Sequence, residues 1–161
     1  MTDNNLMNNI NDTNGDGSAD CADSKARGEA ALVNSSVLAY IGDAVYERYV
    51  RMHVFKKGIL RPDKLNFASV KYVRAESQAR AYDRLADILT EDEAAVARRG
   101  KNHKITSMPH NVDQKTYRKA TGFEALIGYL EVSGAVARLE EIINAAFDII
   151  ENEKIEIKRK A

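Results

Sequence analysis

The chain has 161 residues, of which 44% are hydrophobic and 30% are charged, and its formal net charge at pH 7 is zero. This length suits one domain with a short extension, and the composition supports a packed core and excludes a wholly disordered chain. Two prolines and nine glycines exclude collagen-like or proline-rich low-complexity character. The longest apolar runs are shorter than 18 residues, no secretory leader pattern stands at the amino terminus, and the single cysteine has no disulfide partner. We therefore expect a cytoplasmic protein with no membrane partner.

The first 33 residues are rich in Asn, Asp, Gly and Ser and contain six acidic against two basic residues. Because no apolar period runs through them, residues 1–33 are predicted to form a disordered acidic tail. The polar side chains between Asp12 and Asp23 follow the ligand spacing of a calcium-binding EF-hand loop, with Gly17 at the sharp turn. A loop of this kind normally ends in Glu rather than Asp and follows an amphipathic helix, which the sequence lacks here. A solvated tail is therefore the preferred interpretation, and calcium binding is the alternative.

From position 34 onward the apolar residues recur at helical spacing, and the breaks between the segments carry helix-capping residues. Thr90 with Glu93 has the pattern of a capping box, Asp113 is a helix N-cap, and Gly134 ends a helix. The fold class predicted is an all-α helical bundle, with 34–155 as one domain and 156–161 as a basic C-terminal tail. The expected helices cover about 35–57, 62–68, 73–89, 91–100, 114–133 and 136–150, and residues 101–112 are expected to form a loop.

Basic residues are concentrated between positions 98 and 119, where seven Lys and Arg residues stand against one aspartate. Such a segment in a neutral protein favours an anionic partner, nucleic acid first, although a solvated loop is an equally common origin of such a run. The candidate RNA-binding residues are Arg98, Arg99, Lys101, Lys104, Lys115, Arg118 and Lys119.

Two acids stand out because each lies in an otherwise apolar helix pattern beside small residues. Asp43 follows Gly42, a residue that costs about 0.5–1 kcal/mol in a helix interior and is useful where another helix, chain or substrate approaches closely. Glu124 lies one turn after Thr121 and one turn before Gly128. A single acid in such a position usually forms an ion pair, but two of them in separate long helices indicate a shared Mg²⁺ site.

Two segments carry a resemblance to a known family. LAYIGDAVYERYVR (38–51) resembles the signature helix of the ribonuclease III family, and TYRKATGFEALIGYLEVSG (116–134) is similar to its second carboxylate helix. The RRGKN segment (98–102) and the lack of a double-stranded-RNA-binding domain point to the mini-ribonuclease III subfamily. The resemblance covers about residues 34–150 and implies the ribonuclease III-like endonuclease fold.

The resemblance also implies a function and a site. Asp43 matches the signature aspartate and Glu124 the late glutamate, both implied to be catalytic Mg²⁺ ligands. The longer enzymes of the family carry further acids at the positions of Ala39 and Thr121, a difference that the mini subfamily shares. The implied activity is Mg²⁺-dependent endoribonucleolytic cleavage of double-stranded RNA that leaves 5′-phosphomonoesters. The implied biological role is maturation of the 23S ribosomal RNA precursor in the cytoplasm.

A homodimer with one site per strand is also implied, and Val50 and Val54 form a candidate apolar patch for it near Asp43. The alternative is that another helix of the same chain covers this patch. The competing hypothesis for the whole protein is a non-catalytic helical RNA-binding or ribosome-assembly protein. The sequence leaves open the RNA substrate and cleavage position, the number of Mg²⁺ ions and the role of the amino-terminal tail.

Overall fold

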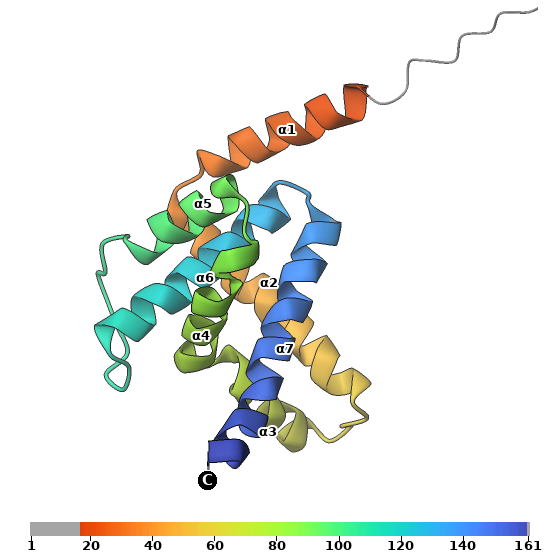
Figure 1. The fold of residues 1–161 in the computed structure, drawn as a ribbon, viewed down its shortest axis with the longest axis vertical. Coiled ribbons are helices and arrows are strands. Elements are labelled where there is room, and N and C mark those ends of the chain that lie inside the picture. Colours follow the sequence, from red (N-terminus) through yellow and green to blue (C-terminus); the bar gives the residue numbers. More distant parts are fainter. Residues whose placement is uncertain (1–16, 161) are drawn as a thin grey trace, which may run out of the picture.

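The computed structural model describes residues 17–160, with side chains over 19–152. Throughout this part of the chain the regular structure is helical, which confirms the predicted all-α class. The elements, coloured along the chain in Figure 1, are α1 (Gly17–Ala31), α2 (Ser35–Lys56), α3 (Pro62–Val73), α4 (Ala75–Leu85), the short 3-10 helix η1 (Ala86–Ile88), α5 (Glu91–Lys101), α6 (Gln114–Val132) and α7 (Val136–Lys160).

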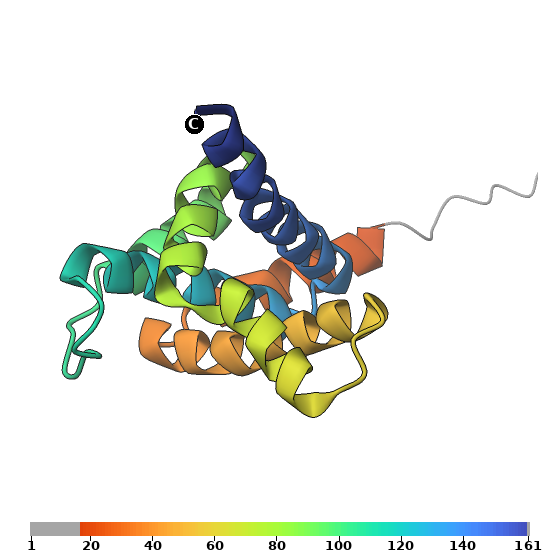
Figure 2. The same cartoon turned by 90° about the horizontal axis from the view of Figure 1, so that it is seen from below.

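Helix α6 forms the centre of the molecule. Helices α2, α4 and α5 pack around it, and α7 covers α4 and part of α6 (Figures 1 and 2). A helix that is covered on several sides must be apolar around most of its circumference, and every residue from 125 to 130 is buried. The segment that joins α5 to α6 extends away from this core in both views.

Glycines allow α6 to approach its neighbours closely. At the crossing with α2, Gly42 and Gly128 lie against the backbone of the other helix, and a Cβ atom at Gly128 would lie 1.9 Å from the carbonyl oxygen of Leu38. The close approach expected at Gly42 is therefore an approach by another helix of the same chain. At the crossing with α5, a Cβ atom at Gly122 would lie 2.7 Å from the carbonyl oxygen of Ala97.

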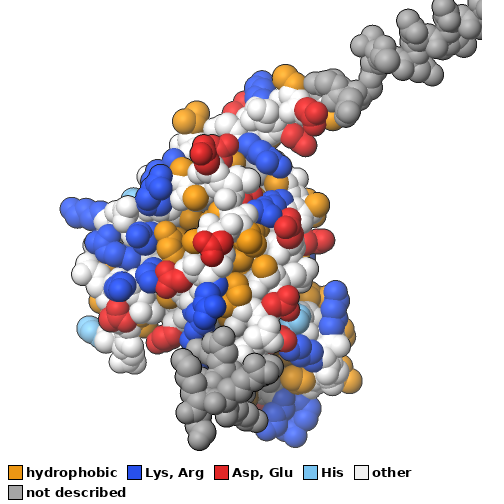
Figure 3. Space-filling model, viewed as in Figure 1, with side chains coloured by type: hydrophobic (Ala, Val, Ile, Leu, Met, Phe, Trp, Pro, Cys, Tyr) orange, Lys and Arg blue, Asp and Glu red, His pale blue; other side chains and the backbone are white. Residues whose placement is uncertain are grey.

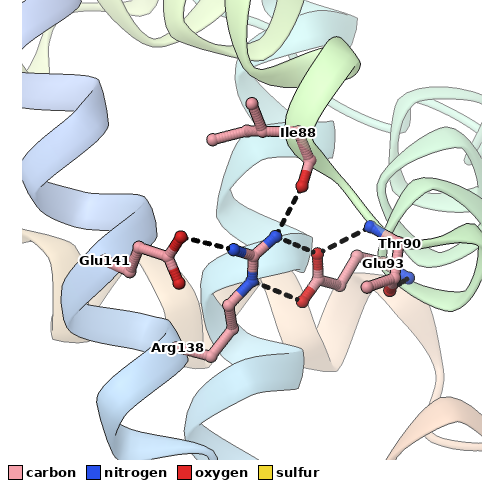
Figure 4. A network of polar contacts seen from close by, with 5 residues as sticks. All are labelled: Ile88, Thr90, Glu93, Arg138 and Glu141. Atoms are coloured by element: carbon pink, nitrogen blue, oxygen red, sulfur yellow. Dashed lines mark hydrogen bonds and ion pairs between the residues drawn. The ribbon is translucent and has the colours of Figure 1, made fainter.

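A capping box begins α5, and an ion pair from the same glutamate connects this helix to α7. Thr90 and Glu93 form the predicted capping box. Glu93, which is buried, also pairs with Arg138 of α7 at 2.9 Å, and Arg138 donates a further bond to the carbonyl oxygen of Ile88 (Figure 4). Burial opposes the charge on Glu93, but the bonds from Arg138 and from the Thr90 backbone hold the pKa of this carboxyl below its usual value. This network fixes one end of α5, whose other end reaches the candidate site.

The amino-terminal prediction is corrected where the structure describes it. Residues 17–31 form helix α1 instead of a disordered tail, because they are rich in alanine, carry a Lys25–Glu29 pair one turn apart and bury Ala30 against the core. The helix also includes residues 17–23, so the second half of the EF-hand pattern is not a loop. The first half, Asp12 to Asp16, lies outside the described residues. In the described part of the chain, no group of three or more Asp, Glu, His or Cys residues could hold a metal ion.

Two further expectations differ from the structure. Helix α7 continues to Lys160, so the boundary expected after residue 155 does not interrupt the helix. Val50 and Val54 are buried in the core of their own chain and therefore do not form a dimer patch. Helix α2 is apolar on several faces, so the sequence did not show which face is turned inward. Val50 and Val54 follow Gly42 by multiples of four residues, and this face of α2 is the one that packs into the core, with Gly42 against α6. Within the described range, no helix is long and apolar enough to cross a membrane.

Candidate active site

Asp43 and Glu124, the two acids selected from the sequence, lie in the same cleft. The cleft has a volume of about 460 Å³ and is bounded by α2, the end of α5, the segment 102–113 and the first turns of α6. Asp43 directly follows Gly42, and Glu124 precedes Gly128 by one turn. The tight crossing at these two glycines therefore fixes the separation of the two helices that carry the acids.

The two carboxyl groups are electrostatically unfavourable neighbours. Burial raises the pKa of Glu124 to about 8, the nearby negative charge of Asp43 adds to this effect, and a hydrogen bond from Gln78 opposes it. Burial also raises the pKa of Asp43, with a smaller contribution from Glu47. Glu47 itself pairs with Arg51 on the helix surface, as a residue one turn away allows. A cation between Asp43 and Glu124 would remove the repulsion and favour the charged form of both.

The donor set of the cleft fits Mg²⁺. This ion prefers carboxylate oxygens and commonly uses one or two of them, with water and substrate phosphate as the remaining ligands. Ala39 and Thr121 also line the cleft, and neither brings a carboxylate. Because the described residues contain no third acid, histidine or cysteine grouped with Asp43 and Glu124, water or phosphate would complete the coordination.

Five of the seven basic residues selected from the sequence surround this cleft or the surface beside it. Lys101, Lys104 and Arg118 line the cleft itself. Arg98, Arg99 and Lys104 line an adjacent, more open hollow of about 600 Å³. Figure 3 shows basic side chains gathered on this end of the molecule, over α5 and the start of α6. The cleft therefore combines an acidic centre with a basic rim.

The other two basic residues have different surroundings. Lys119 forms an ion pair with Asp83 of α4, which occupies its ammonium group. Lys115 is exposed on the first turn of α6 and does not line the cleft. His103 also lines the cleft, and its Nδ1 lies 3.5 Å from the Oγ of Ser35.

Sequence reasoning missed Gln78, a residue of α4 that is buried and donates a hydrogen bond to Glu124. No signal in the sequence distinguishes it from the other polar residues of this helix. Sequence reasoning also missed Tyr40, an exposed aromatic residue that lines the cleft. The only sequence signal for its place in the cleft was its position in the signature helix, directly after Ala39.

An all-helical domain with two paired carboxylates inside a basic cleft is suited to metal-assisted hydrolysis of a nucleic acid. Comparison with known proteins agrees with this class. Residues 36–134 match the family model described as "Ribonuclease III domain". The chain therefore belongs to the ribonuclease III family, and within it to the mini-ribonuclease III group, as its similarity to individual relatives indicates.

Among these relatives, the Mini-ribonuclease 3 of Brevibacillus brevis is 46% identical over 122 residues, which is 76% of this chain and 91% of the relative. That of Symbiobacterium thermophilum is 44% identical over 71% of this chain and 88% of its own length. A crystal structure of a protein from Fusobacterium nucleatum superposes with a TM-score of 0.67 at 26% identity, over 73% of this chain and 93% of that one.

Proposed function

We propose that the protein is a Mg²⁺-dependent endoribonuclease that cleaves double-stranded RNA. The observation that carries this proposal is the meeting of Asp43 and Glu124 in one cleft whose rim is basic. The relatives named Mini-ribonuclease 3 support the same activity by their similarity over most of the chain.

The residues of the cleft divide the work of phosphodiester hydrolysis between them. Asp43 and Glu124 would hold the metal ion, because they supply the carboxylate oxygens. When bound, Mg²⁺ supplies positive charge to the phosphate oxygens and lowers the pKa of water, which provides a nucleophile at neutral pH. Lys101, Lys104 and Arg118 bind the RNA backbone beside the scissile phosphate and hold it in place. The expected products carry a 5′ phosphate and a 3′ hydroxyl.

Recognition in this proposal depends on the shape of the RNA duplex. Side chains cannot read the deep major groove of A-form RNA, so contacts go to phosphates and 2′-hydroxyls across the minor groove. A rim composed of Lys and Arg side chains is suited to such contacts, since phosphate contacts position a nucleic acid without reading its bases. By resemblance to the mini-ribonuclease III group, the substrate proposed is the 23S ribosomal RNA precursor in the cytoplasm.

The proposal includes a homodimer, but through a surface other than Val50 and Val54. Large apolar side chains are exposed on α2, on α3 and in the connection between them, and exposed apolar side chains of this kind are candidates for contact with another chain. We call this the α2–α3 apolar surface; its members are Tyr40, Met52, Phe55, Leu60, Phe67 and Val70. A second copy of the chain would cover it and pair two clefts about a two-fold axis, as cleavage of both strands requires.

The test is cleavage of a duplex RNA in the presence and absence of Mg²⁺. Asp43→Asn and Glu124→Gln each keep the shape of the side chain and remove its charge, so each is expected to abolish cleavage while RNA binding and the fold are retained. Glu47→Gln is the matched control, because Glu47 lies one turn from Asp43 but pairs with Arg51, and this variant should cleave normally. Cleavage by either active-site variant at the wild-type rate would refute the site. Binding of RNA without any Mg²⁺-dependent cleavage by the wild-type protein would favour the non-catalytic RNA-binding alternative.

A further inference from the structure

Helix α1 and the turn after it lie ahead of residues 36–134, the segment that matches the family model. Between residues 19 and 29 this helix is exposed except for the half-buried Ala26, so its contact with the helical bundle is concentrated in its last turn. Ala30 is only 2% exposed, and α1 packs on α6. The docked end is therefore the part of α1 that can influence the rest of the domain.

The docked end of α1 holds a basic residue of α5 through two successive hydrogen bonds. The backbone N–H of Val33 donates to the carbonyl oxygen of Ala30 at 3.2 Å, which closes the turn that leads into α2. The carbonyl oxygen of Val33 accepts a hydrogen bond from Nη2 of Arg99, also at 3.2 Å. Because the donor is the tip of a long and exposed side chain, this bond limits the positions that the positive charge of Arg99 can take.

Arg99 lines the open hollow of about 600 Å³ beside the cleft, which we call the basic hollow. Its lining side chains are all neutral or basic: Ser35, Ala95, Arg98, Arg99, Asn102, His103 and Lys104. His103 and Lys104 also line the cleft that contains the two acids, so the hollow continues the cleft and an RNA backbone can run from one into the other. A guanidinium group has several N–H donors, and the bond to Val33 leaves the others available for a phosphate.

We propose that α1 is part of the RNA-binding surface: through the carbonyl oxygen of Val33 it holds the Arg99 guanidinium at the basic hollow, where Arg99 binds a backbone phosphate of the duplex beyond the scissile one. The inference rests on the proposed function and adds to it a role for the amino-terminal extension. Binding of a phosphate normally has to immobilise a flexible arginine side chain, and holding the side chain in place beforehand removes part of this cost. The expected gain in affinity for RNA is about two- to tenfold.

Ala30→Gln tests the role of α1 in the full-length protein. The larger polar side chain does not fit the buried position of Ala30, so the last turn of α1 should leave α6 and carry the Val33 carbonyl away from Arg99, while the net charge stays the same. Binding of a duplex RNA is measured without Mg²⁺, so that the RNA stays uncut, and we expect the variant to bind about two- to tenfold more weakly. In a cleavage assay with Mg²⁺, its KM for RNA should rise by a similar factor while kcat stays unchanged, because the two acids are untouched.

Ala22→Gln is the matched control. Ala22 is exposed on the same helix, so the same change there should leave α1 docked and RNA binding unchanged. Arg99→Gln removes the held charge and should weaken binding at least as much as Ala30→Gln. In the double variant Ala30→Gln, Arg99→Gln the loss should equal that of Arg99→Gln alone, since α1 acts through this arginine. If Ala30→Gln does not fold, Ala30→Val replaces it, because it enlarges the same buried side chain by less.

Wild-type affinity for RNA in the folded Ala30 variant or in Arg99→Gln would overturn the inference, as would losses that add up in the double variant or an equal loss in Ala22→Gln. Failure of the proposed function gives a different result. The wild-type protein would then not cleave RNA with Mg²⁺, whereas the differences in binding between the variants, measured without Mg²⁺, would remain.

Discussion

The backbone of α2 at Gly42 rests on the carbonyl oxygen of Glu124, so closely that a Cβ atom at position 42 would lie 1.8 Å from it. This contact joins the residue before one of the two proposed metal ligands, Asp43, to the backbone of the other, Glu124. The packing of the two helices and the geometry of the site therefore depend on the same pair of residues.

Gly42→Ala is expected to lower both stability and cleavage. The added methyl group meets backbone, which cannot rotate away, so α2 and α6 must separate at a cost of about 1–3 kcal/mol in the free energy of unfolding. Cleavage should fall further than stability predicts, because the separation moves Asp43 away from Glu124. The control is Gly28→Ala in α1, where nothing lies within 4 Å of the new Cβ atom and alanine should be neutral or stabilising. Urea denaturation and an RNA cleavage assay on both variants test this, and a wild-type rate in a stable Gly42→Ala protein would contradict it.

The second prediction concerns pH in the metal-free protein. The pKa of Glu124 is raised from 4.5 to about 8, so between these values the folded state binds more protons at this group than the unfolded state. The contribution of Glu124 to the free energy of unfolding therefore falls as the pH rises from about 4.5 to about 8. Glu124→Gln removes this titration. The free energy of unfolding of the variant, relative to that of wild type, should therefore increase with pH, and the increase between pH 4 and pH 9 should amount to a few kcal/mol.

Chemical denaturation of both proteins in the presence of a chelator, at pH 5 and at pH 9, measures this difference. Added Mg²⁺ should stabilise the wild type more at pH 9, where both acids are charged, and should leave Glu124→Gln almost unaffected. Equal pH dependence of wild type and variant would show that the environment of Glu124 does not raise its pKa.

The features that could be predicted from the sequence are those with a local cause. The capping box of Thr90 and Glu93 and the N-cap of Asp113 each bond to a backbone group three residues away, so the pattern alone identifies them. The two acids could also be selected from the sequence, because a carboxylate close to small residues in an otherwise apolar helix is unusual whatever the tertiary structure.

The features that could not be predicted depend on contacts between distant segments. The side of α2 that faces inward is decided by the crossing with α6, and the apolar pattern of α2 allows several sides. Lys119 differs from the other basic residues only because α4 places Asp83 beside it.

The third prediction tests the homodimer. Phe67 is 81% exposed in a single chain, so Phe67→Glu removes no packing within the chain and should leave its fold unchanged. If a second copy covers the α2–α3 apolar surface, the charge would be buried in the interface and the protein should become monomeric. Sedimentation equilibrium on wild type and variant measures this. Val132→Glu, at an exposed apolar position of α6 outside that surface, is the control and should remain dimeric. A wild-type protein that sediments as a monomer and still cuts both strands of a duplex would refute the dimer.

The last prediction concerns the basic rim. Lys101 and Lys104 line the cleft on the side of α5 and the following segment, close to where the RNA backbone passes in the proposed complex. Changing both to Gln should weaken the binding of duplexes of different sequence to the same extent, because phosphate contacts carry little sequence information. Each lost contact should make the dependence of log K on log salt shallower by about 0.7–0.9, if the counterion-release rule holds for duplex RNA. Turnover at saturating RNA should fall less than affinity, since neither lysine holds the metal.

The control is the double variant Lys25→Gln, Lys64→Gln, which loses the same two charges on α1 and α3, away from the cleft. It should leave the dependence of log K on log salt nearly unchanged. A slope in the Lys101 and Lys104 variant equal to that of wild type would mean that the RNA lies along another face.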